Sequence, residues 1–238
     1  AAMLALSGSG TALAGTCAVT GPTEVTCNGV FTNDVANDVP VLSMVPDLTL
    51  IVGTDGATTI DPAAGTNGIS SVWGGNATVT SYAEIHVEDA SGIFLNTSDG
   101  NGLVNNYGEI NDYSVGTDVT AIVVSAYDNA TAVNGGDVYA YSMTGTNYDV
   151  TGIGAYAGGT ASVTNTADGS VVANAYSGYA YGIHARGYDY ALAYNDGYVH
   201  ASSFTGDATG ILAESFQYGS SVTNTGTERL VLLVGIAP

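Results

Sequence analysis

The chain has 238 residues, a formal net charge of −20 and only two basic residues, Arg186 and Arg229. Phosphate backbones and anionic lipid surfaces attract lysine and arginine, so this balance excludes nucleic-acid binding and docking on acidic membranes. We interpret the charge as keeping a large β-surface soluble and self-repelling.

The composition favours strands and tight turns over helices. There are 33 Gly and 16 Tyr, and only 10% of the residues are charged. β-Branched and aromatic residues alternate with small polar ones, as is typical of pleated strands. We therefore expect an all-β protein.

The first 14 residues, AAMLALSGSGTALA, have the features of the back half of a secretory signal. A short apolar run is followed by small residues that end in an A-x-A cleavage pattern. The segment is too short to span a bilayer, and no other apolar run reaches the required length. We expect an exported protein whose chain does not itself insert into a membrane.

Residues 15–66 are predicted to form an N-terminal cap and irregular first coils, because they contain strand-like stretches at 41–44 and 48–52 without the repeat described below. Cys17 and Cys27 lie at its start. In an exported protein, two cysteines ten residues apart most simply form one disulfide. A metal site would need more ligands, and a catalytic thiol would need a partner base.

Residues 67–228 contain an internal repeat. Its marker is a Gly-Ile step, once Ala-Ile, and the isoleucines stand at positions 69, 93, 122, 153, 183 and 211. A second marker, Asn-x-Gly, follows most of these steps, with its asparagines at positions 106, 134, 195 and 224, and it is stretched by two residues between Asn165 and Gly169. The isoleucines are 24 to 31 residues apart. A repeat of this length is typical of solenoids, in which each repeat buries its apolar face on the next.

Each repeat holds three short runs in which every second residue is apolar or small, so each run is predicted to be a strand with one buried face. Parallel stacking of the repeats then gives a β-solenoid with three short strands per coil of about 28–31 residues. The rival use of Asn-x-Gly is a hairpin turn in an antiparallel sandwich or barrel, which the long period disfavours.

The asparagines are expected at a corner of each coil, where their side-chain amides can bond to one another as a ladder. An ordinary Asn-Gly turn is the alternative. Thr80, Thr164 and Thr223 recur just before this position, but Val133 interrupts the row that an ice- or crystal-binding solenoid would need. Residues 229–238, RLVLLVGIAP, follow Glu228 without the pattern and are predicted to be a last strand or a truncated segment.

Several units are similar to those of a known family. The segments ATGILAES, YGIHARG and SVTNTG, together with the cysteine-containing GTCAVTGPTEVTCNGV, resemble repeats in the passenger domains of bacterial autotransporters. The resemblance covers about 68–228. It implies a right-handed parallel β-helix on the cell surface, held at the outer membrane by a translocator that this chain does not include. Such passengers serve adhesion, biofilm formation or host contact.

The main alternative is a polysaccharide-acting β-helix enzyme, either a glycosidase or lyase-like. Glycosidases need two carboxylates about 5–10 Å apart, and Asp168 with Asp196 or Asp189 with Glu214 are pairs on adjacent coils. The lyases of this fold remove a proton with lysine or arginine, but we expect Arg186 to have a structural or solvated role. Acidic residues are so numerous that such pairs also arise by chance, and we predict no catalytic residues.

The remaining candidates are histidines and tyrosines. His86, His184 and His200 would have to converge from different coils to bind a metal, so we expect surface residues and neither a metal nor a cofactor. Tyrosines are adaptable contact residues, and they either form a binding surface or shield strand ends and linkers. Partners would then be a host cell, a glycan or another copy. The tyrosines in question stand at 139, 141, 148, 156, 176, 179, 181, 188, 190, 194 and 198.

Overall fold

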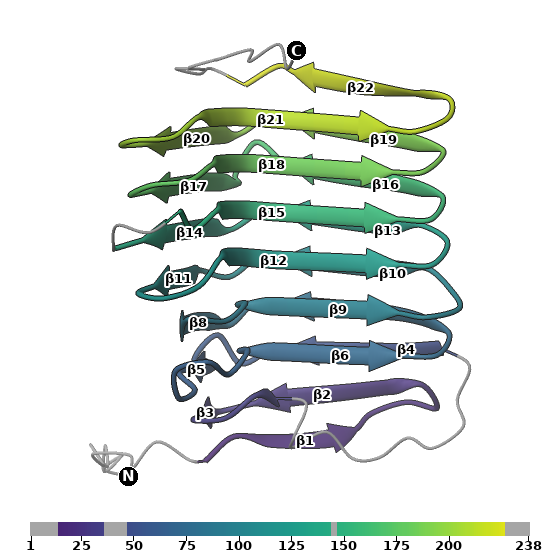
Figure 1. Ribbon diagram of the computed structural model, residues 1–238. Coiled ribbons are helices and arrows are strands. Elements are labelled where there is room, and N and C mark those ends of the chain that lie inside the picture. Colours follow the sequence, from purple (N-terminus) through teal and green to yellow (C-terminus); the bar gives the residue numbers. More distant parts are fainter. Residues whose placement is uncertain (1–13, 36–46, 144–146, 227–238) are drawn as a thin grey trace, which may run out of the picture.

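The computed structural model describes residues 14–35, 47–143 and 147–226 (Figure 1). These residues form 22 strands in three sheets, so the predicted all-β solenoid is confirmed. No helix in the described ranges is long and apolar enough to cross a membrane. Four predicted features lie outside the described residues: the signal segment up to residue 13, the stretch at 41–44, Glu228, and the segment 229–238.

Each full coil gives one strand to each of three sheets, in the same order. Sheet 1 contains β6 (Ile69–Trp73), β9 (Ile93–Thr97), β12 (Val119–Ala126), β15 (Val150–Ala157), β18 (Ala180–Gly187) and β21 (Ala208–Ser215). Sheet 2 contains β1 (Thr16–Val19), β2 (Glu24–Asn28), β4 (Asp47–Val52), β7 (Asn76–Ser81), β10 (Gly102–Asn106), β13 (Ala130–Asn134), β16 (Thr160–Asn165), β19 (Tyr190–Asn195) and β22 (Gly219–Asn224). Sheet 3 contains β3 (Val30–Phe31), β5 (Thr59–Ile60), β8 (Glu84–Glu88), β11 (Ile110–Ser114), β14 (Asp137–Ser142), β17 (Ser170–Ala175) and β20 (Tyr198–Ser203).

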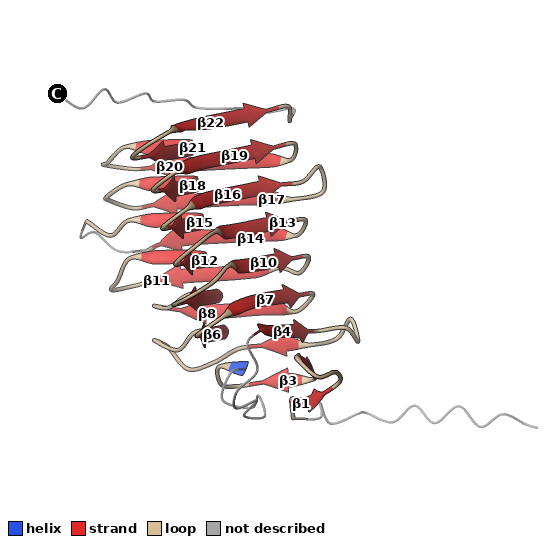
Figure 2. Cartoon of the chain, turned by 90° about the vertical axis from the view of Figure 1, so that its right-hand side faces the viewer, coloured by secondary structure: helices blue, strands red, loops and turns tan. Residues whose placement is uncertain are grey.

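The coil is right-handed. In Figure 1 the strands of sheet 1 run across the front, and the chain then returns behind them one level higher with every coil. This is the hand that a crossover between parallel strands almost always takes. Figure 2, turned by 90°, shows the same strands stacked level upon level along one axis.

The predicted register is confirmed. The repeat isoleucines pair directly from coil to coil, from Ile69 through Ile153 to Ile211. Five of these six isoleucines are at most 1% exposed, and only Ile211, in the last coil, reaches 7%. The predicted interruption of the threonine row is confirmed as well, because Asn105 and Val133 take its place in two consecutive coils and Tyr194 in a third.

The glycine of the Gly-Ile step has a packing role. A Cβ atom added at Gly152 would collide with Cγ1 of Val171 in sheet 3, and one added at Gly182 would collide with Cγ1 of Val199. The narrow interior therefore holds the β-branched side chain of sheet 3 only because sheet 1 presents no side chain there. This explains why glycine precedes isoleucine in most coils.

The asparagine ladder is present at the corner between sheets 2 and 3. Nδ2 of each asparagine donates to Oδ1 of the next, at 2.9 Å from Asn106 to Asn134, 2.9 Å from Asn134 to Asn165, 2.8 Å from Asn165 to Asn195 and 2.9 Å from Asn195 to Asn224. Each of the first four also donates to a carbonyl of its own turn, as Asn134 does to Gly136. The amides thus satisfy a buried corner that would otherwise hold unpaired backbone carbonyls.

The two ends of the solenoid differ. At the N-terminal end β1 runs antiparallel to β2, which places Cys17 opposite Cys27, and these residues form the predicted disulfide. The Phe31 ring fills the interior beside Gly15, where a Cβ atom would overlap it. At the other end every residue of β22 is exposed, including Val222.

One buried carboxyl group was not predicted. Asp112 is 0% exposed and occupies an inward position of sheet 3 between Val87 and Ala140. Neither of its carboxyl oxygens has a hydrogen-bond partner among the described residues. Burial raises the pKa of Asp112 to about 8, and the nearby Asp89 carboxylate raises it as well. The nearby Gly92 backbone N–H lowers the pKa and so partly opposes both effects, although it does not form a hydrogen bond with the carboxyl group.

Candidate binding surface

The two carboxylate pairs singled out from the sequence lie in different places. Asp168 and Asp196 are exposed on adjacent turns between sheets 2 and 3. Asp189 lies in the turn between β18 and β19, whereas Glu214 is on the outer face of β21. Glu214 is engaged by His184, whose Nε2 lies 3.2 Å from Glu214 Oε2.

The three histidines do not come together. His86 is on β8 and contacts Glu84 at 2.8 Å, His184 is on β18 in sheet 1, and the His200 ring stacks beside Tyr198 on β20. In the part of the chain that the structure describes, no group of three or more His, Cys, Asp and Glu side chains is placed to hold a metal ion.

The tyrosines lie both in the turns and on the strands. Many stand on the outer faces of strands, because outward positions alternate with the buried ones. Aromatic rings of adjacent coils contact one another: Tyr113 and Tyr141 are stacked with centroids 6.0 Å apart, and Tyr190 and Tyr218 are tilted by 31° with centroids 5.3 Å apart. The exposed aromatic residues concentrate in the last coils: Tyr176, Tyr179, Tyr188, Tyr190, Tyr194, Tyr198, Phe204, Phe216 and Tyr218.

A mixed aromatic and charged cluster covers the outer face of sheet 1 in these coils. The Tyr156 ring lies over Gly154, where a Cβ atom would approach the ring to 2.7 Å. Tyr156 meets His184 edge-on at 5.6 Å, and Tyr181 stacks on the same imidazole at 5.2 Å. Burial raises the pKa of the Tyr156 phenol, while the charge of Arg186 opposes that rise. Tyr156 is therefore a neutral hydroxyl at physiological pH.

Arg186 makes a structural contact on this surface, which is one of the two roles expected for it. Its guanidinium carbon lies 5.0 Å from the centre of the Phe216 ring, in cation–π geometry. Glu214 is its register partner on β21, but Arg186 forms no salt bridge with any described residue. Since His184 holds Glu214, the guanidinium keeps its donors available on the surface.

The corner between sheets 1 and 2 loses its side chains in one coil. Tyr127, Gly158, Tyr188 and Phe216 each follow the register-matched ends of β12, β15, β18 and β21. Asp128, Gly159 and Asp189 form the next column, joined by the backbone bonds Gly159 N to Asp128 O and Asp189 N to Gly159 O. The pair Gly158–Gly159 thus replaces a Tyr-Asp pair that is present one coil below and one coil above.

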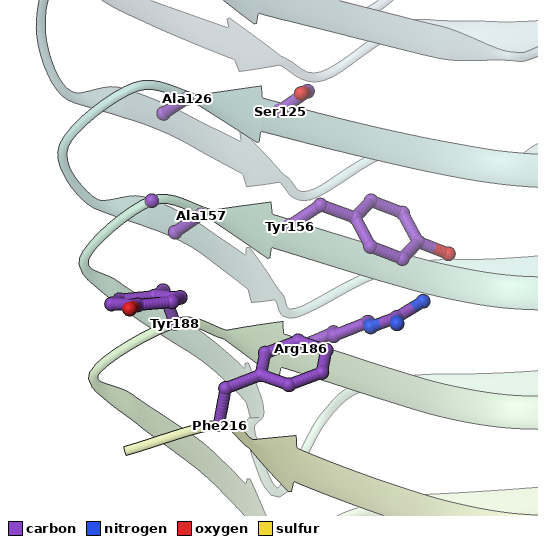
Figure 3. A pocket seen from close by; sticks show the side chains of 8 residues that line it. Ser125, Ala126, Tyr156, Ala157, Arg186, Tyr188 and Phe216 are labelled. Carbon is purple, nitrogen blue, oxygen red and sulfur yellow. The ribbon is translucent and has the colours of Figure 1, made fainter. Parts of the chain in front are cut away.

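Two open hollows meet at Gly158. The first, about 460 Å³, is bordered by Ala126, Tyr156, Gly158, Arg186, Tyr188 and Phe216. In Figure 3 the Arg186 side chain extends past the Phe216 ring toward Tyr156, whereas Tyr188 lies on the other side of Phe216 and is seen nearly edge-on. The second, about 420 Å³, is bordered by Tyr127, Asp128, Asn129, Gly158, Gly159 and Asp189. Both volumes fall within the range of roughly 300–1,000 Å³ typical of small-ligand sites.

Part of this surface was predicted from the sequence and part was not. Arg186, Asp189, Tyr156 and Tyr188 were candidates, whereas Phe216 and the Gly158–Gly159 pair were not. The signal was present, because aligning the coils at their isoleucines places Gly-Gly in the column that holds Tyr-Asp in two neighbouring coils.

Comparisons of this chain with models of known protein families, with curated proteins and with solved structures gave no match.

Proposed function

We propose that this chain is the displayed, adhesive part of a bacterial surface protein of the autotransporter passenger type, and that it has no catalytic role. The observation that carries the proposal is the row of exposed aromatic side chains along the outer faces of the last coils. Large exposed apolar surface on an otherwise soluble protein typically marks an interaction site.

The architecture supports this proposal. Regular stacking makes the solenoid a stiff rod, and its outward residues repeat at every coil, so several weak contacts can act together. The Cys17–Cys27 disulfide suits an oxidising environment outside the cytoplasm. A net charge of −20 keeps such rods apart until a specific contact forms.

Adhesion of beads coated with the chain tests the proposal. We expect such beads to attach to epithelial cells or to chain-coated surfaces. A triple substitution of two tyrosines on β19 and one in the turn before β22, Tyr190→Ser with Tyr194→Ser and Tyr218→Ser, should reduce attachment about tenfold, because the three rings are 40–65% exposed. The control is Val72→Ser, which removes an equally exposed side chain from the first full coil.

Two outcomes would contradict the proposal. One is attachment that is absent for the parent chain on every surface. The other is release of reducing ends from pectin-like polysaccharides by the purified chain, which would favour the enzyme alternative.

A further inference from the structure

The geometry points to the two hollows at Gly158 as one binding groove for a short glycan whose ring carries a single carboxylate, such as a uronic or a sialic acid. We define the Gly158 groove by Tyr127, Asp128, Gly158, Arg186, Tyr188 and Phe216. This inference rests on the proposed adhesive function and names the class of ligand that one part of the surface takes.

The spacing of the coils leaves room for one ring. Paired strands of neighbouring coils lie about 4.8 Å apart, so Tyr127 and Tyr188, two coils apart, stand about 9.6 Å apart along the axis. Elsewhere on the surface, aromatic rings of neighbouring coils lie next to each other. The ring centroids of Tyr188 and Phe216, for example, are 6.4 Å apart. A sugar ring at the level of Gly158 would therefore stack on Tyr188 as a further layer of the same column.

Backbone contacts keep this level open. A Cβ atom at Gly158 would collide with the Tyr127 carbonyl oxygen, and one at Gly159 would lie 2.6 Å from the Asp128 carbonyl oxygen. Tyr188 is fixed beside the gap, because its hydroxyl accepts a hydrogen bond of 2.9 Å from Gln217 Nε2. The groove is thus formed before a ligand arrives, which lowers the entropic cost of binding.

Charge selects the ligand. Arg186 is the one arginine or lysine within the described ranges of a chain with a net charge of −20. Its unpaired donors at the groove match a planar carboxylate. A polyanion would be repelled by the rest of the surface, so a ligand with a single carboxylate fits better. The side chains of Asp128 and Asp189 form no hydrogen bond with other described residues and can accept sugar hydroxyls.

Glycan titrations of the intact chain test the inference. The probes are 3′-sialyllactose, methyl glucuronide and lactose, followed by saturation-transfer NMR and calorimetry. We expect one or both of the acidic sugars to bind at least tenfold more tightly than lactose, and the two acidic probes distinguish a sialic from a uronic source. Arg186→Gln should abolish the preference for the acidic sugar, and Tyr188→Ala should weaken binding of every sugar about tenfold.

The matched control is Phe204→Ala, which removes a ring that is 79% exposed but lies between β20 and β21, outside the groove. It should leave the titrations unchanged. Three results would overturn the inference: no preference for the acidic probes, binding unaffected by both groove substitutions, or equal binding of a short peptide with a free carboxyl terminus. If coated beads still adhere in that case, only the groove is wrong and the adhesive function stands.

Discussion

Two polar features are buried in the same core, and they differ in their hydrogen bonding. The asparagine ladder places four consecutive amides, from Asn106 to Asn195, where each donates to its own turn and to the next coil. Asp112 lies one sheet away, and its two carboxyl oxygens have no partner among the described residues. The ladder is a repeated solution, whereas Asp112 interrupts a column that is otherwise apolar, with Val87 below and Ala140 above.

The comparison shows how a solenoid can and cannot bury polar groups. A polar side chain that recurs at the same position finds its partner in the adjacent coil, so burial adds little net cost. A polar side chain that occurs in one coil meets apolar neighbours and bears its full desolvation cost. Asp112 escapes part of that cost by keeping its proton, since burial raises its pKa to about 8.

The largest expected effect is the pH dependence of stability that Asp112 causes. Its pKa is about 8 in the folded chain, against 3.8 for an ordinary aspartate, so between these values the folded state retains a proton that the unfolded state has lost. Stability should therefore fall as the pH rises from about 4 to about 8, by on the order of 5 kcal/mol in total. Asp112→Ala, which restores the side chain found at Ala140, should remove this decline and raise the urea midpoint at pH 8.

Two further variants separate charge from polarity. Asp112→Asn keeps a buried polar group without a titrating proton, so its urea midpoint should be less dependent on pH but lower than that of Asp112→Ala. Asp137→Ala, at an exposed position of the adjacent strand β14, should change neither the urea midpoint nor its dependence on pH. If Asp112→Ala kept the decline of the parent chain, the assignment to this carboxyl group would be wrong.

Breaking the ladder at its centre should have the next largest effect. Asn165 donates to Gly169 O and Asn195 Oδ1 and accepts from Asn134 Nδ2, and all of these atoms are buried or partly buried. Asn165→Ala would leave them unpaired and should lower stability by about 3 kcal/mol. Urea unfolding followed by circular dichroism measures the change, and the loss should be nearly independent of pH.

Thr164→Ala is the control for this substitution, because Thr164 lies on the same strand with its side chain on the outer face. It should change stability by less than about 0.5 kcal/mol. Equal losses for the two variants would mean that the ladder bonds contribute nothing beyond the strand itself.

These cases also mark what could be predicted from the sequence. The ladder was predictable because its signal repeats: Asn106, Asn134 and Asn195 each stand two residues before a glycine. The stacking of Ile153 on Ile183 was predictable for the same reason. Repetition places each residue by comparison with its equivalents, without any knowledge of contacts between sheets.

Features that occur in a single coil were missed. The alternation in β11 places Asp112 inward with Ile110, but its equivalents Val87 and Ala140 are apolar, so repetition gives no signal for a buried carboxyl group. The Phe216–Arg186 contact depends on which side chains of two coils meet on the outer face, and the strand period does not determine that. The groove at Gly158 was missed because glycines were interpreted as turns, whereas here their missing side chains create the space.

The smallest expected effect on stability concerns Asn106, the first asparagine of the ladder. Asn106 Oδ1 is buried and has no hydrogen-bond partner among the described residues, and its register partner in the preceding coil is Ser81. In the ladder, each Nδ2 donates to the Oδ1 of the asparagine in the next coil. Ser81→Asn would therefore place a donor one coil before Asn106, in register with its Oδ1. It should raise stability by about 1 kcal/mol, measured as a higher urea midpoint at constant m-value. Ser81→Ala, which supplies no donor, should not raise it, and a gain from alanine equal to that from asparagine would show that the unpaired amide oxygen carries no cost.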